Sequence, residues 1–204
     1  MSTPPAAPDS ALEPGSAWHP ARTVVLVGLM GAGKSSIGRR LAQRLELPFV
    51  DADKEIEAAA GCTIEEIFER FGEAAFRDGE RRVILRLLDG APHVLATGGG
   101  AFMDPVIRQR MRSVAVSIWL KADIELLLKR VSRRNNRPLL KGENPREVLQ
   151  RLIDVRYPVY GEADLRVESL DGPPEQTVQK VIDELHRFAG RRGLPAGESS
   201  RERA

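Results

Sequence analysis

The chain has 204 residues, a length that suits one domain with its own hydrophobic core. It carries 31 Lys and Arg against 29 Asp and Glu, and the resulting formal net charge of +2 is too small to indicate a nucleic-acid-binding protein. The single cysteine, Cys62, excludes an internal disulfide and a cysteine-based zinc site, and we expect it to be a small buried filler.

The two ends of the chain differ in composition from the rest. Residues 1–20 are rich in Pro, Ala and Ser and lack the basic start and apolar core of a secretory signal, so a disordered extension is predicted. Residues 190–204 are polar and predict a disordered tail. No apolar run approaches the roughly 20 residues that cross a bilayer. We therefore expect a single domain over residues 21–189 in a soluble, cytoplasmic protein that binds no membrane.

The first predicted strand, residues 24–27, runs into the sequence Gly-Leu-Met-Gly-Ala-Gly-Lys-Ser at residues 28–35. In this G-x-x-x-x-G-K-[ST] pattern, small residues let backbone N–H groups curl around a phosphate at the positive end of a helix. Lys34 can then reach the β- and γ-phosphates, and Ser35 can ligate Mg²⁺. A Gly-rich turn without function is the alternative, but the apolar residues after the loop recur at helical spacing, which favours nucleotide binding. The small residues are Gly31, Ala32 and Gly33.

Two carboxylates follow the apolar run of the second predicted strand, residues 49–50. We expect this strand to end in Asp51-Ala52-Asp53, beside the phosphate loop of a doubly wound sheet. One carboxylate can hold Mg²⁺ while the other meets a substrate hydroxyl. Asp53 has an alternative role as the cap of a helix over residues 54–60. Asp51 directly follows an apolar strand and needs a partner, for which Mg²⁺ or Lys34 is nearest.

Short apolar runs recur along the chain with helical patterns between them. Such continuous runs indicate strands covered on both faces, so we predict an α/β fold with a parallel sheet of about five strands and helices on each side. Residues 53–89 carry no strand signal and predict an inserted helical subdomain, in which Thr63 and Glu66 form a capping box. The basic residues 132–145, broken by Pro and Gly, predict a mobile lid over phosphates. The expected strands lie at residues 24–27, 49–50, 94–96, 114–120 and 165–167.

These motifs stand in the order found in shikimate kinases, and the chain resembles that family from about residue 22 to about residue 188. Residues 26–42 resemble the family's first motif almost residue for residue. The resemblance implies a three-layer P-loop kinase with a five-stranded parallel sheet, a helical substrate-binding insertion and a mobile lid. The other matching motifs are Asp51-x-Asp53, Ile67-Phe68, Phe71-Gly72-Glu73-x-x-Phe76-Arg77, Thr97-Gly98-Gly99-Gly100-Ala101, Arg137-Pro138-Leu139-Leu140 and Arg156-x-Pro158-x-Tyr160.

The resemblance implies a site for shikimate, a cyclohexene carboxylate with three hydroxyls. Arg77 and Arg156 match the family's carboxylate-binding pair, and guanidinium forks suit bidentate recognition of a carboxylate. Glu80 would fix Arg77 by an i,i+3 pair, although a solvated helix face explains it equally well. Glycines after the third strand would let the ring approach backbone amides, unless they form only a turn. These glycines are Gly98, Gly99 and Gly100. The resemblance also implies that Phe68 and Phe76 form apolar walls of the shikimate site, although at helical spacing either could belong to the hydrophobic core.

The activity that the resemblance implies is transfer of the ATP γ-phosphate to the 3-hydroxyl of shikimate, giving 3-phosphoshikimate and ADP on the route to chorismate and the aromatic amino acids. Asp53 would contact the accepting hydroxyl and either take its proton or only orient it, because the transition state is loose. Lys34 and the lid residue Arg137 would stabilise charge on the transferred group. Ser35 would ligate Mg²⁺ directly, and Asp51 through water. The implied ATP contacts are Gly31, Ala32, Gly33, Lys34, Ser35, Ser36, Arg130, Arg137 and Pro174.

Some of these assignments have alternatives. The resemblance places Arg130 and Pro174 beside adenine. Arg130 could instead be a surface residue of a helix, and Pro174 could be the first residue of a helix.

A sugar-acid kinase such as a gluconate kinase is the nearest other function, and the glycine run with Arg77 and Arg156 argues against it. A binding module without catalysis would need a damaged catalytic residue, and none is missing. Near-neutral charge argues against RNA binding by the lid. We expect a monomer.

Overall fold

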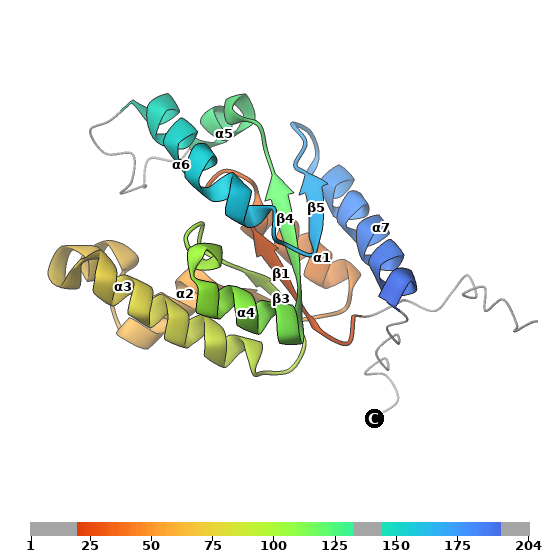
Figure 1. Ribbon diagram of the computed structural model, residues 1–204, viewed down its shortest axis with the longest axis horizontal. Coiled ribbons are helices and arrows are strands. Elements are labelled where there is room, and N and C mark those ends of the chain that lie inside the picture. Colours follow the sequence, from red (N-terminus) through yellow and green to blue (C-terminus); the bar gives the residue numbers. More distant parts are fainter. Residues whose placement is uncertain (1–19, 133–143, 193–204) are drawn as a thin grey trace, which may run out of the picture.

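The computed structural model describes residues 20–132 and 144–192. Residues 1–19 of the predicted N-terminal extension, residues 193–204 of the predicted tail, and residues 133–143 of the predicted lid lie outside the described residues. Arg137 lies in this last segment, outside the described residues. The described residues form a sheet with helices packed around it (Figure 1).

A five-stranded sheet forms the centre of the molecule, and each strand is parallel to its neighbours. The prediction of a five-stranded parallel sheet is confirmed. The strands are β1 (Thr23–Val27), β2 (Phe49–Asp51), β3 (Val94–Ala96), β4 (Ala115–Lys121) and β5 (Leu165–Glu168). Their order β2-β3-β1-β4-β5 puts β1 in the middle, where all five of its residues are buried.

Helices cover both faces of this sheet, which makes three layers. They are α1 (Lys34–Arg44), α2 (Ala52–Ala60), α3 (Ile64–Leu88), η1 (Ala101–Met103), α4 (Pro105–Val114), α5 (Ile124–Val131), α6 (Pro145–Tyr160) and α7 (Pro174–Arg192). Helices α1 and α7 contact each other on one side of the sheet, and α4 contacts α3 and β4 on the other (Figure 1). Among the helices of the described ranges, none is long and apolar enough to cross a lipid bilayer.

The junction between β2 and α2 differs from the prediction. β2 ends at Asp51 and α2 begins at Ala52, so Asp53 lies in the first helical turn and not at the end of the strand. No Gly or Pro separates the two elements, and Ala52 has high helix propensity. The alternative that Asp53 caps the helix is also wrong, because Asp51 occupies the N-cap position and its side chain makes no capping bond.

Helices α2 and α3 fill the stretch between β2 and β3, in which no strand occurs. The predicted capping box is present: Glu66 N donates to Thr63 Oγ1 at 3.2 Å, and Thr63 N donates to Glu66 Oε2 at 2.8 Å. Gly72, with φ 78° and ψ 175°, breaks α3 into two segments. A small hydrophobic cluster holds α2 and α3 together, and its buried members are Ile56, Ile67, Phe76 and Val83.

Candidate active site

The loop after β1 places the start of a helix at the carboxyl edge of the sheet. Gly33 is the N-cap residue of α1 with a φ of 96° and has no side chain that could cap the helix, and the first turn of α1 contains no acidic residue. The first N–H groups of α1 are therefore open to an anion, which the helix dipole favours. Gly28, with a φ of 142°, tolerates no side chain, because an added Cβ would lie 2.7 Å from the carbonyl oxygen of Leu120.

Polar side chains gather around this loop. Nζ of Lys34 donates to the carbonyl oxygens of Gly28 at 2.7 Å and Leu29 at 3.1 Å, so the ammonium group bends back over the loop. The hydroxyl of Ser35 donates to Oδ2 of Asp51 at 2.8 Å. The structure thus brings together Ser35 and Asp51, two side chains that the sequence suggested for magnesium.

The pair of Ser35 and Asp51 fits a magnesium ion held mainly by phosphate and water. Mg²⁺ usually binds through one or two carboxylates together with substrate phosphates. Within residues 20–132 and 144–192, no group of three or more His, Cys, Asp or Glu residues could hold a metal ion. The donors present therefore suit an ion that arrives with a nucleotide.

Side chains from three helices converge on the glycine turn, residues 98–100, which follows β3. An added Cβ on the first glycine would lie 2.9 Å from Oε1 of Glu80 and 3.0 Å from Oδ1 of Asp53. On the second glycine it would lie 3.2 Å from Nη1 of Arg156, and on the third it would collide with the guanidinium group of Arg77. Glycine at these positions leaves the space that the charged ends of the four side chains occupy, and a Cβ at Gly100 would displace Arg77. The glycine turn therefore lies against two arginines and two carboxylates.

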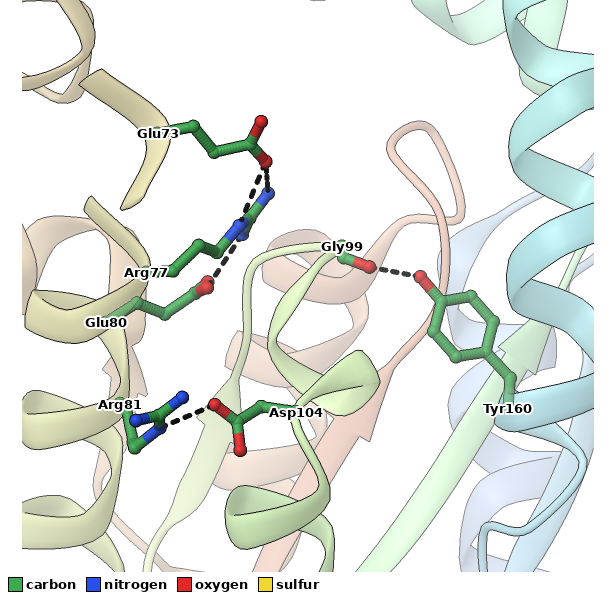
Figure 2. Close-up of polar contacts among 7 residues, drawn as sticks. All are labelled: Glu73, Arg77, Glu80, Arg81, Gly99, Asp104 and Tyr160. Carbon is green, nitrogen blue, oxygen red and sulfur yellow. Dashed lines mark hydrogen bonds and ion pairs between the residues drawn. The ribbon is translucent and has the colours of Figure 1, made fainter. Parts of the chain in front are cut away.

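The guanidinium group of Arg77 lies between two carboxylates of its own helix (Figure 2). Nη1 donates to Oε2 of Glu80 at 2.7 Å. Nε and Nη2 both donate to Oε1 of Glu73, at 3.2 and 3.0 Å. Burial opposes the charge on Arg77, but the bonds to Glu80 and Glu73 outweigh burial and raise the pKa of Arg77. The arginine is therefore a fixed cation.

Glu80 is buried, with 2% of its surface exposed, so the alternative of a solvated helix face is wrong. Burial raises the pKa of Glu80, while Arg77 opposes this shift and Asp53 adds to it. Its Oε1 atom is buried and has no hydrogen-bond partner among the described residues. A buried acceptor of this kind costs free energy unless a donor reaches it.

The two predicted aromatic walls differ in burial. Phe76 is buried in the small cluster between α2 and α3, which agrees with its alternative role as core. Phe68 is half-buried and packs on Phe76 with 4.7 Å between ring centroids. The guanidinium carbon of Arg77 lies 5.0 Å from the Phe76 ring centroid, so the ring supports the arginine.

Arg130 joins the phosphate loop to the segment after β5. Its Nη1 donates to the carbonyl oxygen of Gly31 at 3.2 Å and to Oγ of Ser169 at 2.9 Å, and its Nη2 donates to the carbonyl oxygen of Leu170 at 2.5 Å. Arg130 is therefore no simple surface residue. Pro174 is half-buried and is the first residue of α7, as its structural alternative predicted.

Three residues at this site had no role in the sequence interpretation: Glu73, Tyr160 and Ser169. Glu73 stands four residues before an arginine on a helix, and that spacing could have indicated the pair. The contacts of Tyr160 and Ser169 join distant segments, and no local pattern predicts them. Ser36, expected beside ATP, has a hydroxyl that accepts from Nη1 of Arg40 at 2.9 Å.

A phosphate loop beside a cluster of arginines and carboxylates, at the carboxyl edge of a parallel sheet, is the arrangement of a P-loop kinase for a small molecule. A sequence model described as shikimate kinase matches residues 30–186. The chain belongs to the shikimate kinase family.

Relatives with this name are similar over most of their length. The chain is 63% identical over 164 residues to a shikimate kinase of Paramagnetospirillum magneticum, covering 80% of this chain and 84% of the relative. It is 61% identical over 165 residues to a shikimate kinase of Bradyrhizobium diazoefficiens, covering 81% of this chain and 80% of the relative. A solved shikimate kinase from Acinetobacter baumannii in complex with shikimate is 40% identical with a TM-score of 0.78, covering 81% of this chain and 93% of that one. A gluconokinase from Sinorhizobium meliloti, 18% identical with a TM-score of 0.60 over 86% and 98% of the two chains, shares the fold.

Proposed function

We propose that the protein is a shikimate kinase that transfers the γ-phosphate of ATP to the 3-hydroxyl of shikimate, giving 3-phosphoshikimate and ADP. The observation that carries this proposal is the convergence of Asp53, Arg77 and Arg156 on the glycine turn. The similarity to a kinase solved with shikimate supports the same acceptor. In this function the acceptor carboxylate would lie between the two guanidinium groups, and its hydroxyls would face Asp53.

The unsatisfied oxygen of Glu80 supports an acceptor with several hydroxyls. Oε1 of Glu80 and Oδ1 of Asp53 both lie against the first glycine of the turn. A hydroxyl that donates to Oε1 would supply its missing partner, which an apolar ligand could not do. Phe68 would contact the ring of the acceptor from the α3 side, and Phe76, which packs on Phe68, would support this wall from the core.

The transfer itself would depend on positioning and on neutralising charge. Asp53 would hold the acceptor hydroxyl and take its proton as the bond to phosphorus forms. Lys34, bound to the loop through two carbonyl oxygens, would turn its ammonium group to the transferred phosphoryl group. Arg137, which lies outside the described residues, would add positive charge from the predicted lid.

ATP would bind along the loop of residues 28–35 and the first turn of α1. Bound with it, Mg²⁺ supplies charge neutralisation at the β- and γ-phosphates. Ser35 would ligate this ion, and Asp51 would reach it through water. Arg130 and Pro174 would flank adenine, since Arg130 already bonds the loop. The other loop contacts are Gly31, Ala32, Gly33 and Ser36.

We also infer how the enzyme is organised. A single kinase domain over residues 21–189 would use α2 and α3 as its substrate-binding insertion and residues 132–145 as its lid. The single sheet and the contacts of α3 with the glycine turn support this division. A monomeric, cytoplasmic enzyme agrees with the near-neutral charge and the lone cysteine.

ADP release tests the function. The purified chain receives Mg·ATP with shikimate, gluconate or no acceptor, and mass spectrometry identifies the product. We expect turnover with shikimate alone and its loss when EDTA removes Mg²⁺. Turnover only with gluconate would keep the kinase fold and overturn the acceptor assignment. No turnover with any acceptor would leave a nucleotide-binding module.

A separate prediction concerns Glu73, which occupies the Nε and Nη2 edge of Arg77. A substrate carboxylate would bind this same edge, so it must displace Glu73 first. Because 63% of the Glu73 side chain is exposed, the pair is weak and easily released. Glu73→Gln is expected to lower the Kd and KM for shikimate about two- to fivefold, as removal of a competing state does.

Asp78→Asn is the matched control, because it removes another acid and arginine pair at the same i,i+4 spacing on α3, with 3.0 Å between Oδ2 of Asp78 and Nη2 of Arg82. We expect it to leave the Kd for shikimate unchanged. Calorimetric titration measures both variants. A weaker affinity in Glu73→Gln would mean that Glu73 orients Arg77 for the substrate and does not compete with it.

A further inference from the structure

Tyr160, the last residue of α6, is buried with none of its surface exposed. Its hydroxyl donates to the carbonyl oxygen of Gly99, a residue 61 positions earlier in the chain (Figure 2). This bond joins α6 to the glycine turn. The reaction described above gives Tyr160 no role.

The peptide group between Gly99 and Gly100 has two ends that point in opposite directions. It is trans, since no cis peptide occurs in the described residues, so the Gly100 N–H points away from the Gly99 carbonyl. Tyr160 binds the carbonyl from one side, and Arg77 lies on the other side of Gly99 (Figure 2). The Gly100 N–H is therefore directed toward the Arg77 side, where the acceptor would bind.

Two adjacent glycines do not fix the direction of this peptide by themselves. Neither has a Cβ, so the peptide group can rotate between two orientations with little steric cost. One orientation presents an N–H donor to the acceptor, and the other presents a carbonyl oxygen that would repel its carboxylate. A hydrogen bond from outside the turn can select between them.

The surroundings of Tyr160 allow its hydroxyl to hold the Gly99–Gly100 peptide group in one orientation. Its ring packs among Trp119, Phe102 and Tyr157, with centroid distances of 6.1, 6.3 and 6.2 Å. Burial is the main cause that raises the pKa of Tyr160 to about 12, so the hydroxyl stays a donor at neutral pH. Arg156, one helical turn earlier, lies against the same glycine turn, so one face of α6 contributes both contacts.

We propose that Tyr160 is a positioning residue, which holds the Gly99 carbonyl so that the Gly100 N–H faces the acceptor. This inference rests on the proposed shikimate kinase function. Tyr160 itself would touch neither substrate, so its effect would pass through the glycine turn and through Arg156, whose side chain also interacts with the Tyr160 hydroxyl.

Tyr160→Phe tests the proposal, because it keeps the ring and removes only the hydroxyl. We expect kcat/KM for shikimate to fall about 10- to 100-fold, since the Gly99 carbonyl loses its partner and the peptide can rotate. The Kd for ATP should stay within about twofold, because the phosphate loop is untouched. A purely structural role would lower stability without this selective loss.

Tyr157→Phe is the matched control. Tyr157 lies on the same helix and in the same aromatic cluster, and its hydroxyl also donates to a backbone carbonyl oxygen, that of Ala122. We expect kcat/KM for shikimate to stay within about twofold in this variant. Equal losses in the two variants would overturn the proposal. Inactivity of the wild-type chain toward shikimate would instead overturn the proposed function.

A measurement on the wild-type chain covers the case in which Tyr160→Phe does not fold. In protein labelled with ¹⁵N-glycine, the amide signal of Gly100 should shift when shikimate is added, as expected for a new hydrogen bond. Binding of shikimate that leaves the Gly100 signal in place would contradict the proposal.

Discussion

Replacing Asp53 with Asn is expected to lower kcat for shikimate phosphorylation about 10²- to 10⁴-fold, the range that general-base catalysis contributes. Asn keeps the shape of the side chain and can still accept a hydrogen bond, but it cannot take the proton of the hydroxyl. The carboxylate lies against the first glycine of the turn, with Oδ1 3.0 Å from an added Cβ. Steady-state kinetics with saturating Mg·ATP measures the loss.

The size of the effect separates two roles for Asp53. If the carboxylate only orients the hydroxyl, the Asn oxygen keeps most of that function and kcat falls roughly tenfold or less. Asp51→Asn supplies a contrast, because Asp51 bonds Ser35 at the phosphate loop. It should raise the Mg²⁺ concentration needed for half-maximal rate, whereas Asp53→Asn should leave that concentration unchanged.

The phosphate loop was predictable because its information is local. An apolar strand, the loop of residues 28–35 and a helical pattern stand within about 20 residues, and each favours the same structure. The capping box of Thr63 and Glu66 is local too, and it was predicted correctly. Such features depend on neighbours in the sequence and need no knowledge of the tertiary fold.

Element boundaries were less predictable where no turn residue marks them. Val114 was expected to begin the fourth strand, yet it is the last residue of α4, and β4 begins at Ala115. The helix passes into the strand without Gly or Pro, so the apolar run spans both elements. The same cause placed Asp53 on a strand in the sequence interpretation, although it lies in α2.

Contacts between distant segments could not be derived from the sequence. Glu80 follows Arg77 on a helix at a spacing that fits both an exposed pair and a buried one, and only the packing of α3 against the glycine turn decides between them. Tyr160 and Gly99 are 61 residues apart, and Arg130 and Ser169 are 39 apart. Tertiary packing alone brings such pairs together, so the positioning residues of the site emerged only from the structure.

Arg77→Ala is expected to lower kcat/KM for shikimate about 10²- to 10³-fold, because the acceptor carboxylate would lose one of its two guanidinium partners. The Kd for ATP should stay unchanged, since Arg77 contacts the acceptor side only. Arg81→Ala is the matched control: Arg81 lies on the same helix and pairs with Asp104 at 2.6 Å, away from the glycine turn (Figure 2). It should leave kcat/KM for shikimate within about twofold.

Loss of Arg77 also affects folding, through Glu80. Removing Arg77, whose side chain is 30% exposed, would leave the buried Glu80 without its hydrogen-bonded cation, which destabilises the fold while Glu80 stays charged. The pKa of Glu80 is already raised, chiefly by burial, and Arg77 opposes that rise, so Arg77→Ala raises it further. A carboxyl whose pKa is higher in the folded state favours folding when protonated, and this stability is lost as the pH rises through the folded pKa. Arg77→Ala should therefore be close to wild type in stability at acidic pH and fall behind as the pH rises.

The double variant Arg77→Ala, Glu80→Gln separates folding from binding. Gln is neutral, so the destabilisation that grows with pH should disappear, and urea denaturation between about pH 4 and pH 8 would show it. Shikimate use should stay as low as in Arg77→Ala, because no guanidinium group returns to the pocket. Recovery of kcat/KM together with stability would mean that Arg77 serves only to neutralise Glu80, and the acceptor carboxylate would then have to bind through Arg156 alone.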